Sequence, residues 1–207
     1  MNEDIFVPVG VYFQGCYNPY YEAGIMKCKE VCYEYNSLRP SEHERRAEIL
    51  GDLLGGAGRN PIFEPPFFCD YGGHIFVGDD FYANRNLVVN DGAEVRFGNN
   101  VFVGPNCCFT TAEHALDPEM RKAGVELAKP ITVGDNVWIG AGSIVLAGAK
   151  IGDNTVIGAG SVVKGEIPSG VVAVGVPCRV LRKITAADRT AYPLHESIAA
   201  QWSDRRD

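Results

Sequence analysis

The chain has 207 residues, 46% of them hydrophobic, which is enough for one sizeable core with an appendage. Its formal net charge of −7 and the absence of a basic run argue against a nucleic-acid-binding protein. No apolar run reaches the ~18 residues that span a membrane, and the first residues lack the basic and apolar regions of a secretory signal. The seven cysteines show no CxxC spacing, so we expect reduced thiols in a cytoplasmic protein.

The N-terminal part of the chain is predicted to contain two short helices. Residues 1–18 are aromatic, with Gly and Pro but no clear period, and we assign them no structure. A helix is expected over 20–36, and a second, shorter one begins with the capping box Ser41 to Glu44 and ends at Gly55. Helices this short do not persist alone in water, so both must dock on the rest of the chain. The apolar stripes are Ile25, Cys28, Val31, Cys32 and Tyr35 in the first helix and Ala47, Leu50, Leu53 and Leu54 in the second.

The second half of the chain repeats an aliphatic residue every sixth position. A period this short predicts a stacked array in which three flat strands make one turn of a triangular prism, with the aliphatic side chains on its axis. Gly and Asn between them suit tight corners because they tolerate positive φ. We therefore expect a mainly β fold, a hexapeptide-repeat β-helix. The repeat positions are Val133, Ile139, Val145, Ile151, Ile157 and Val163, preceded by a weaker series at Val77, Ala83, Val89, Phe97, Val103 and Phe109.

The register is interrupted between Phe109 and Val133. This stretch carries charges and two prolines and has no aliphatic hexad, so we expect a loop extruded from the prism, over 110–130. Long irregular loops on a rigid scaffold are often functional. After Pro168 the hexads end, and residues 170–185 are predicted to form a closing strand over the last coil. The expected division is a helical segment at 1–58, a β-helix at 59–181 and a tail at 182–207.

Several blocks resemble a known family in their order along the chain. They are FCDYGGHIFVG, FYANRNLVVNDGAEVRFGNNVFVGPNC, EHALDPEMRKAGVELAKPITVGDNVWIGAGSIV and GVPCRVLRKI, preceded by the segment that ends in YEYN. Together they are similar to the galactoside and maltose O-acetyltransferases. The resemblance implies a left-handed parallel β-helix, acetyl-CoA as the acetyl donor, a sugar acceptor, and homotrimers with active sites between neighbouring prisms.

Acetyl transfer from a thioester to a hydroxyl requires a base that removes the hydroxyl proton. Histidine is the best single candidate near neutral pH. Of the four histidines, His43 lies in a charged helix start and His195 in the polar tail, so both are expected to be surface groups. His114 lies where the hexad register breaks, and the resemblance implies that it is the general base. The resemblance also places Asn84 against the acceptor hydroxyl and the reaction centre.

The resemblance implies further contacts to the acceptor. Asp70 and Asp91 match acceptor-side positions, and a two-oxygen carboxylate suits paired sugar hydroxyls. Glu126 either orients His114 or touches the acceptor. The family usually has an Asp in the N-terminal segment, for which Asn18 is the nearest match here. The neighbouring tyrosines either stack on a sugar ring or pack on the helix; they are Tyr17, Tyr20 and Tyr21.

The coenzyme A site is likewise implied by matching positions. Ala141 and Ala159 correspond to backbone groups that bind the pantetheine amides. Trp138 either lines the groove or packs in an interface. Arg179 and Arg182 match basic residues near the phosphates, for which the planar Arg fork is well suited. Lys164 is shifted by one position from the usual lysine of the family.

Other functions use the same prism. An antibiotic O-acetyltransferase, of the chloramphenicol or streptogramin type, shares the base but not the two-helix segment. A non-catalytic scaffold would need neither the loop histidine nor the coenzyme A positions. A γ-type carbonic anhydrase needs three zinc-binding histidines, and only His74 and His114 lie in or beside the coils. We expect no metal in the chemistry and no covalent nucleophile, since the Cys107-Cys108 pair falls on a coil where burial alternates.

Overall fold

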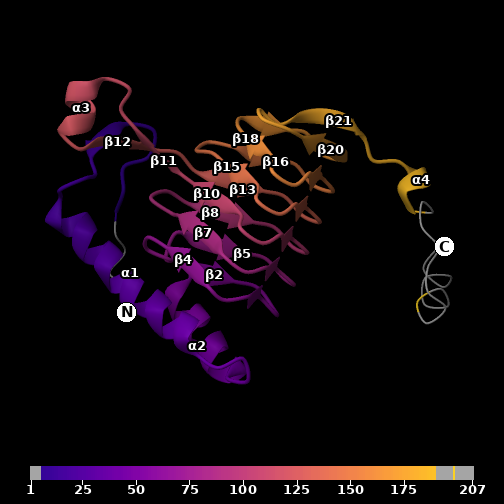
Figure 1. The fold of residues 1–207 in the computed structure, drawn as a ribbon, viewed down its shortest axis with the longest axis horizontal. Helices are drawn as coiled ribbons and strands as arrows, with labels where there is room; N and C mark the ends of the chain where they lie inside the picture. Colours follow the sequence, from indigo (N-terminus) through magenta and orange to yellow (C-terminus); the bar gives the residue numbers. More distant parts are fainter. Residues whose placement is uncertain (1–5, 190–197, 199–207) are drawn as a thin grey trace.

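The computed structural model describes residues 6–189 and residue 198, so His195 and most of the expected tail lie outside the described part. The chain winds into a stack of triangular coils, with two helices across the first coils and an extruded loop at one side (Figure 1). Within the described residues, no helix is long and apolar enough to cross a membrane.

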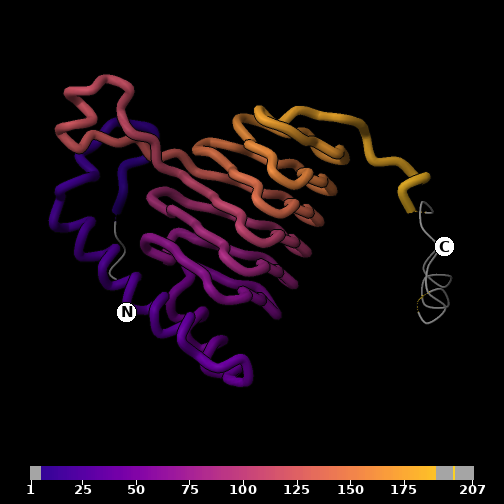
Figure 2. The backbone as a smooth tube through the Cα atoms, in the orientation of Figure 1, coloured from indigo at the N-terminus to yellow at the C-terminus, as the bar shows by residue number. Residues whose placement is uncertain are grey.

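Three parallel sheets form the faces of the prism, which Figure 2 shows as a continuous spiral. All neighbouring strands are parallel except the last pair, β20 and β21. The five-stranded face consists of β4 (Phe67–Cys69), β7 (Leu87–Asn90), β10 (Cys108–Thr110), β15 (Ile144–Val145) and β18 (Val162–Val163). The six-stranded face consists of β2 (Gly56–Ala57), β5 (Ile75–Val77), β8 (Val95–Phe97), β13 (Ile131–Val133), β16 (Lys150–Ile151) and β19 (Glu166–Ile167). The seven-stranded face consists of β3 (Ile62–Phe63), β6 (Tyr82–Ala83), β9 (Phe102–Val103), β14 (Trp138–Ile139), β17 (Val156–Ile157), β20 (Val171–Val174) and β21 (Arg179–Lys183).

The predicted repeat positions form the axis of the prism. All twelve side chains of the two series are buried, from Val77 to Val163. In the first coils the axis is filled by stacked rings, because Phe81 lies 4.9 Å from Phe63 and 5.0 Å from Phe97. The later coils are filled by Ile and Val. Aromatic and aliphatic coils thus share one continuous core, and the six-residue period is confirmed.

Asparagines make many of the corners, as the sequence predicts. Asn86, Asn106 and Asn136 have φ values of 61°, 60° and 56°, in the left-handed region that Asn tolerates better than most residues. Their side chains also bond from coil to coil: Nδ2 of Asn136 donates to Oδ1 of Asn154 at 3.1 Å. These hydrogen bonds between asparagines at the corners fix how successive coils are aligned with one another.

The two predicted helices are present and cover the first coils. α1 (Pro19–Ser37) packs on β4, where Asn36 exchanges two hydrogen bonds with the backbone of Phe67, at 2.8 and 2.9 Å, and α2 (His43–Leu53) packs on α1. The expected capping box is wrong, because α2 begins later, with Glu42 as an N-cap that makes no side-chain cap. Glu42 instead accepts a hydrogen bond from the N–H of Arg39. In the apolar stripe predicted for the second helix, Ala47 is exposed. Ile49, which was not part of that stripe, is buried.

The ends of the prism differ from the predicted boundaries. The first coil begins at β2, so the six-stranded face includes Gly56, which the expected division left in the helical segment. The closing strand is two strands, since β20 ends at Val174 and β21 returns antiparallel beside it. β21 runs on to Lys183, beyond the expected end of the β-helix at 181, and α4 (Ala186–Arg189) follows.

Candidate active site

The interrupted stretch leaves the prism after β10 and returns at β13 (Figure 1). It is more regular than the expected loop: β11 (Ala112–His114) and β12 (Val125–Ala128) pair antiparallel, and α3 (Pro118–Lys122) joins them. Asp117 caps α3 by accepting two backbone N–H groups, and proline occupies the first helical position. We call this excursion the His114 loop.

The N-terminal segment adds a third strand to the His114 loop. β1 (Tyr12–Gln14) pairs antiparallel with β12, so the strand order is β1-β12-β11. Gly15 follows directly, and a Cβ at this position would collide with Oε2 of Glu126. Because Gly15 has no side chain, the N-terminal segment can pass close to Glu126. We assigned this segment no structure from the sequence.

His114, Glu126 and Cys16 meet on one side of this small sheet. His114 is the register partner of Glu126, and its Nδ1 lies 3.5 Å from Oε1 of Glu126. The thiol of Cys16 donates to the same oxygen at 2.9 Å. Burial and the hydrogen bond to Glu126 raise the pKa of Cys16 to about 11, so the thiol stays protonated. The His114 side chain is 58% exposed, whereas that of Glu126 is 19% exposed. The imidazole is therefore open to solvent on one side and contacts a largely buried carboxylate on the other.

Cys16, and not Asn18, is the N-terminal residue that reaches this group. Oδ1 of Asn18 accepts the N–H of Tyr20 at 3.1 Å and caps α1, while its Nδ2 donates to the carbonyl of Gln14. Within this chain Asn18 therefore caps a helix, and its contact with an acceptor stays a prediction. Of the tyrosines nearby, Tyr21 packs edge-on to Phe13 and Tyr20, with ring centroids 5.6 and 5.3 Å apart.

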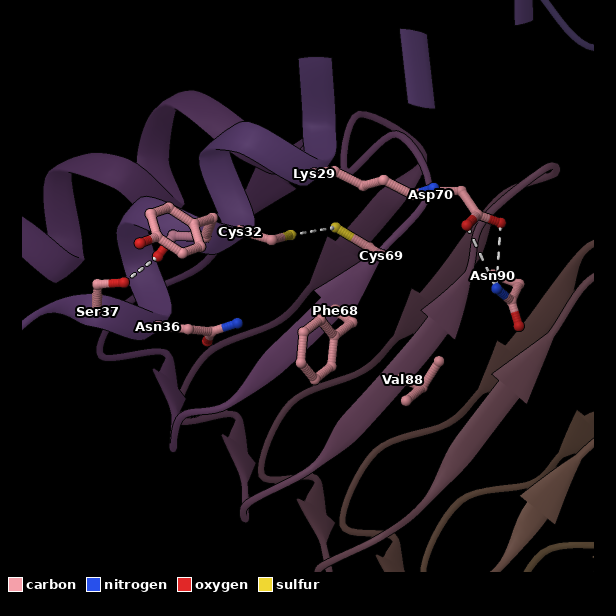
Figure 3. A pocket seen from close by; sticks show the side chains of 10 residues that line it. Lys29, Cys32, Asn36, Ser37, Phe68, Cys69, Asp70, Val88 and Asn90 are labelled. Carbon is pink, nitrogen blue, oxygen red and sulfur yellow. Dashed lines mark hydrogen bonds between the residues drawn. The ribbon is translucent and has the colours of Figure 1, made fainter. Parts of the chain in front are cut away.

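Asp70 lies in a pocket of about 630 Å³ between α1 and the five-stranded face. Nδ2 of Asn90 donates to both of its oxygens, at 3.3 and 3.2 Å, and the side chain of Lys29 reaches toward it (Figure 3). Burial and the nearby Asp91 carboxylate raise the pKa of Asp70 to about 6. The pocket thus offers a carboxyl, an amide and an ammonium group beside the apolar walls of Phe68 and Val88, as Figure 3 shows.

Asp91 is completely buried, which argues against its predicted contact with an acceptor. Its Oδ1 accepts the backbone N–H groups of Asp70 and Tyr71, both at 2.9 Å, and its own carbonyl accepts a hydrogen bond from Nδ1 of His74 at 2.6 Å. Oδ2 has no hydrogen-bond partner within the described part of the chain. Burial raises the pKa of Asp91. Asp91 therefore holds the turn that presents Asp70.

Asn84 lies at another edge of the prism, where the chain passes from the seven-stranded to the five-stranded face; we call this the Asn84 edge. Its Oδ1 accepts the N–H of Arg85 at 2.8 Å, and its Nδ2 donates to no other group in the described part of the chain. Ala141 and Ala159 stack above it at the same edge, both exposed. Among the described residues their two N–H groups have no acceptor, whereas the carbonyl of Ala141 accepts from Gly160 at 2.8 Å. This edge therefore displays free amide donors in successive coils.

The three basic residues predicted to bind coenzyme A lie at different places in the fold. Arg179 begins β21 near the Asn84 edge, where its Nη1 donates to the carbonyl of Cys178 at 2.8 Å. Arg182 forms a double hydrogen-bonded ion pair with Asp188, at 2.6 and 2.9 Å, so its guanidinium is already engaged within the chain. Lys164 follows β18 and is exposed at the next edge of the prism.

The site candidates fall into two groups at two edges. Asp70, His114 and Lys164 all follow strands of the five-stranded face, at the edge where the chain turns toward the six-stranded face; we call this the His114 edge. The Asn84 edge lies on the other side of the same face. An extended chain from Asn84 to Asp91, across β7, covers up to roughly 20 Å. Within the described residues no hydrogen bond or ion pair joins His114 to Asn84.

The outer surfaces of the three faces differ in polarity. Apart from Phe76, which Arg96 covers, the six-stranded face carries polar side chains, among them the ion pair of Lys150 with Glu166 at 2.9 Å. The other two faces carry apolar side chains in register from coil to coil. On the seven-stranded face these are Ile62, Tyr82, Phe102, Trp138, Val156 and Val172. On the five-stranded face they are Phe68, Val88, Cys108, Ile144 and Val162.

Two clusters of potential metal ligands occur in the described part of the chain. One is Cys28, Cys32 and Cys69, all buried where α1 packs on β4, with the Sγ atoms of Cys28 and Cys69 3.4 Å apart. The other is Cys16, His114 and Glu126. The sequence alone identified neither cluster, because each combines residues far apart in the chain.

Comparisons with family models give two matches. Residues 130–165 match the bacterial transferase hexapeptide family, in the form of six repeats. Residues 15–58 match the maltose acetyltransferase hexapeptide capping motif, which accounts for the helices across the first coils. The hexapeptide match identifies the coil as the left-handed parallel β-helix that the sequence analysis expected.

Whole-chain comparisons agree with these matches. A putative acetyltransferase of Saccharomyces cerevisiae is 48% identical over 178 residues, covering 84% of this chain and 91% of its own. The galactoside O-acetyltransferase of Escherichia coli is 43% identical over 167 residues, covering 81% of this chain and 82% of its own. A solved structure of galactoside acetyltransferase in complex with coenzyme A superposes with a TM-score of 0.83 at 40% identity, covering 90% of this chain and 92% of that one.

Proposed function

Because the chain belongs to the hexapeptide-repeat acetyltransferases of the galactoside and maltose O-acetyltransferase type, we propose that it transfers acetyl from acetyl-CoA to a hydroxyl group of a sugar. The acceptor is a galactoside, maltose or a related sugar. The observation that carries the proposal is the imidazole of His114, exposed on a loop that leaves the prism and anchored on Glu126. A non-catalytic scaffold has no use for this arrangement.

His114 acts as the general base. With Nδ1–H directed at Oε1 of Glu126, the neutral ring keeps its other nitrogen, Nε2, free to accept a proton. Nε2 takes the proton of the acceptor hydroxyl as the oxygen attacks the thioester carbonyl. When the tetrahedral intermediate collapses, the same nitrogen returns the proton to the departing thiolate. Acetyl passes directly between the two substrates, and the protein forms no covalent bond to it.

Glu126 positions the base. Its carboxylate accepts from Cys16 at 2.9 Å and lies 3.5 Å from His114, so the Nδ1–H tautomer is favoured over the one with the proton on Nε2. The imidazolium that forms during attack is stabilised by the same carboxylate, as a charge beside an opposite charge. Glu126 therefore favours the orientation of the His114 ring and the positive charge that the ring takes up during the reaction.

The complete site requires two copies of the chain. His114 and Asn84 lie at opposite edges of the five-stranded face, so one copy cannot bring them to one substrate. The two apolar faces that flank the Asn84 edge suit contact with neighbouring copies, whereas the polar six-stranded face suits solvent. A homotrimer in which the Asn84 edge of one copy meets the His114 edge of the next completes each site. Asn84 then steadies the acceptor and the oxyanion.

Coenzyme A fits the groove between such edges. The free N–H groups of Ala141 and Ala159 are donors for the two pantetheine amides, one coil apart. Arg179 provides a guanidinium for the phosphates at the far end. Lys164 joins it from the neighbouring copy, because it lies at the His114 edge. Arg182 contributes only if its pair with Asp188 opens.

The acceptor lies beside the Asp70 pocket. The carboxyl of Asp70 and the amide of Asn90 provide acceptor and donor groups for paired hydroxyls, and the wall of Phe68 and Val88 suits the apolar face of a sugar ring. A carboxyl of pKa about 6 is mostly ionised at neutral pH and accepts hydrogen bonds from hydroxyl groups there.

An acceptor screen tests the function. Purified protein is incubated with acetyl-CoA and galactosides, maltose, glucose or chloramphenicol, and release of the free thiol is followed. We expect turnover with one of the sugars and none with chloramphenicol. Turnover with chloramphenicol alone would favour the antibiotic type, and the absence of thiol release with every acceptor would favour a scaffold.

A further inference from the structure

Cys16, His114 and Glu126 each place one potential metal-ligand atom close together beside the proposed active site. Their sulfur, nitrogen and oxygen atoms all lie within 4.8 Å of one another. The residues come from the N-terminal segment and from both strands of the His114 loop, so the fold assembles them from distant parts of the chain. We propose that these three residues form a binding site for Zn²⁺, and that the bound ion blocks acetyl transfer.

The distances fit a tetrahedral zinc ion. Zinc lies about 2.3 Å from sulfur and 2.0–2.1 Å from nitrogen or oxygen, so tetrahedral angles place N and O ligands ~3.3 Å apart and S and O ligands ~3.6 Å apart. Nδ1 of His114 and Oε1 of Glu126 are 3.5 Å apart. Sγ of Cys16 is 2.9 Å from the same oxygen and has to withdraw slightly. The thiol hydrogen now occupies the space between sulfur and carboxylate that the cation would take.

The charge of the surroundings also favours a cation. The carboxylates of Asp91 and Glu126 both contribute to the raised pKa of Asp70, so three acidic groups share this end of the prism. His114 is exposed, which leaves an approach from solvent. The buried cluster of Cys28, Cys32 and Cys69 has no comparable approach, because each of these side chains is at most 6% exposed. Three protein ligands leave the fourth zinc position open to water.

Binding is a ligand exchange without oxidation or reduction. A Zn–S bond forms as the Cys16 S–H bond breaks and its proton leaves to solvent, while Glu126 and His114 donate lone pairs. Coordination through Nδ1 fixes the remaining imidazole proton on Nε2. That nitrogen then has no lone pair for the acceptor hydroxyl, so the general base is lost. The inhibitory consequence rests on the proposed function, whereas the binding itself does not.

Cobalt provides a direct test of binding, because Co²⁺ replaces zinc in such sites and thiolate ligation gives it a charge-transfer absorption. Metal-free protein is titrated with Co²⁺ and then with Zn²⁺, alongside Cys16→Ser and the matched control Cys108→Ser, which alters another half-buried thiol. We expect one thiolate-bound Co²⁺ per chain in the wild type and in Cys108→Ser, displaced by Zn²⁺. In Cys16→Ser the absorption is absent, and zinc affinity falls at least ~100-fold.

If the cobalt–thiolate absorption is absent in the wild type, or persists in Cys16→Ser, the proposed zinc site is wrong. Activity is measured separately by loss of the thioester absorbance, because zinc would bind a thiol reporter. Saturating Zn²⁺ is expected to abolish turnover in the wild type and to leave Cys16→Ser at the rate that this variant shows without zinc. Turnover by the zinc-loaded wild type overturns the inhibition. Cobalt binding without any acetyl transfer in metal-free protein would reject the proposed function alone. Acetyl transfer without cobalt binding would reject the zinc site alone.

Discussion

Nδ1 of His114 and Oε1 of Glu126 lie 3.5 Å apart, directly across the β11–β12 pair. This register makes the carboxylate the fixed partner of the imidazole, in a loop that pairs with β1 of the N-terminal segment. The contact places a base and the group that orients it on one small sheet outside the prism.

Replacing His114 by Asn should remove the general base. Because general-base catalysis contributes roughly 10²–10⁴-fold, we expect kcat to fall by that range. The side chain is 58% exposed, so the midpoint of thermal unfolding should not change. His43→Asn, at the exposed start of α2, is the control and should retain full activity. A His114→Asn enzyme with kcat near that of the wild type would refute the assignment.

Glu126→Gln should keep the shape of the site and lose the charge that positions His114. Loss of the carboxylate charge 3.5 Å from the imidazole should cost ~1.4–2.7 kcal/mol of transition-state stabilisation, which corresponds to roughly 10–100-fold in kcat. The KM for acetyl-CoA should be unchanged, since Glu126 is not one of the residues proposed to bind coenzyme A. Glu113→Gln provides the matched control, because Glu113 lies in the same strand pair but faces Lys129. An altered KM with unchanged kcat would indicate a binding role instead.

Asp70 should make stability depend on pH. Its pKa is 3.8 in the unfolded chain and about 6 in the folded protein, so between pH 4 and 6 the folded state binds more protons. Stability therefore falls as pH rises through this window, by up to about 3 kcal/mol. Asp70→Asn removes this contribution, so urea unfolding should show the variant gaining stability over the wild type above pH 6. Equal pH dependence of the two proteins would contradict the raised pKa.

The apolar outer faces should hold the copies together. Phe102→Arg places a charge in the apolar series of the seven-stranded face, where the side chain is now 53% exposed. Sedimentation should then show monomers, and acetyl transfer should be lost with the shared sites. Thr132→Arg adds the same charge to the exposed six-stranded face and should leave a trimer. A Phe102→Arg trimer would show that another surface forms the interface.

The sequence predicts the prism well because its period is local. Each sixth residue points to the axis whatever the rest of the chain does, so Val133 to Val163 are buried as expected. The same alternation also marks Asp91, since Leu87, Val89 and Asp91 face inward on successive odd positions. That signal was available in the sequence, and it identifies a buried support rather than a substrate ligand.

Pairing between distant segments could not be read from the sequence. β1 meets β12 with Tyr12 opposite Leu127, and no periodicity in either segment indicates this contact. The contact of Cys16 with Glu126 depends on that pairing, so Cys16 was missed. The sequence does contain the signal that Asn18 is a cap, because it directly precedes a proline at the start of a helix.

The claim that each site combines His114 from one copy with Asn84 from the next has a direct test. His114→Ala and Asn84→Ala subunits, each inactive alone, are coexpressed with different tags, and the mixed trimers are purified. Each mixed trimer, whichever variant contributes two copies, has one of its three sites with both intact residues, so the purified mixed trimers should recover about a third of wild-type activity. Mixed trimers no more active than the two variants assayed separately would contradict the shared site.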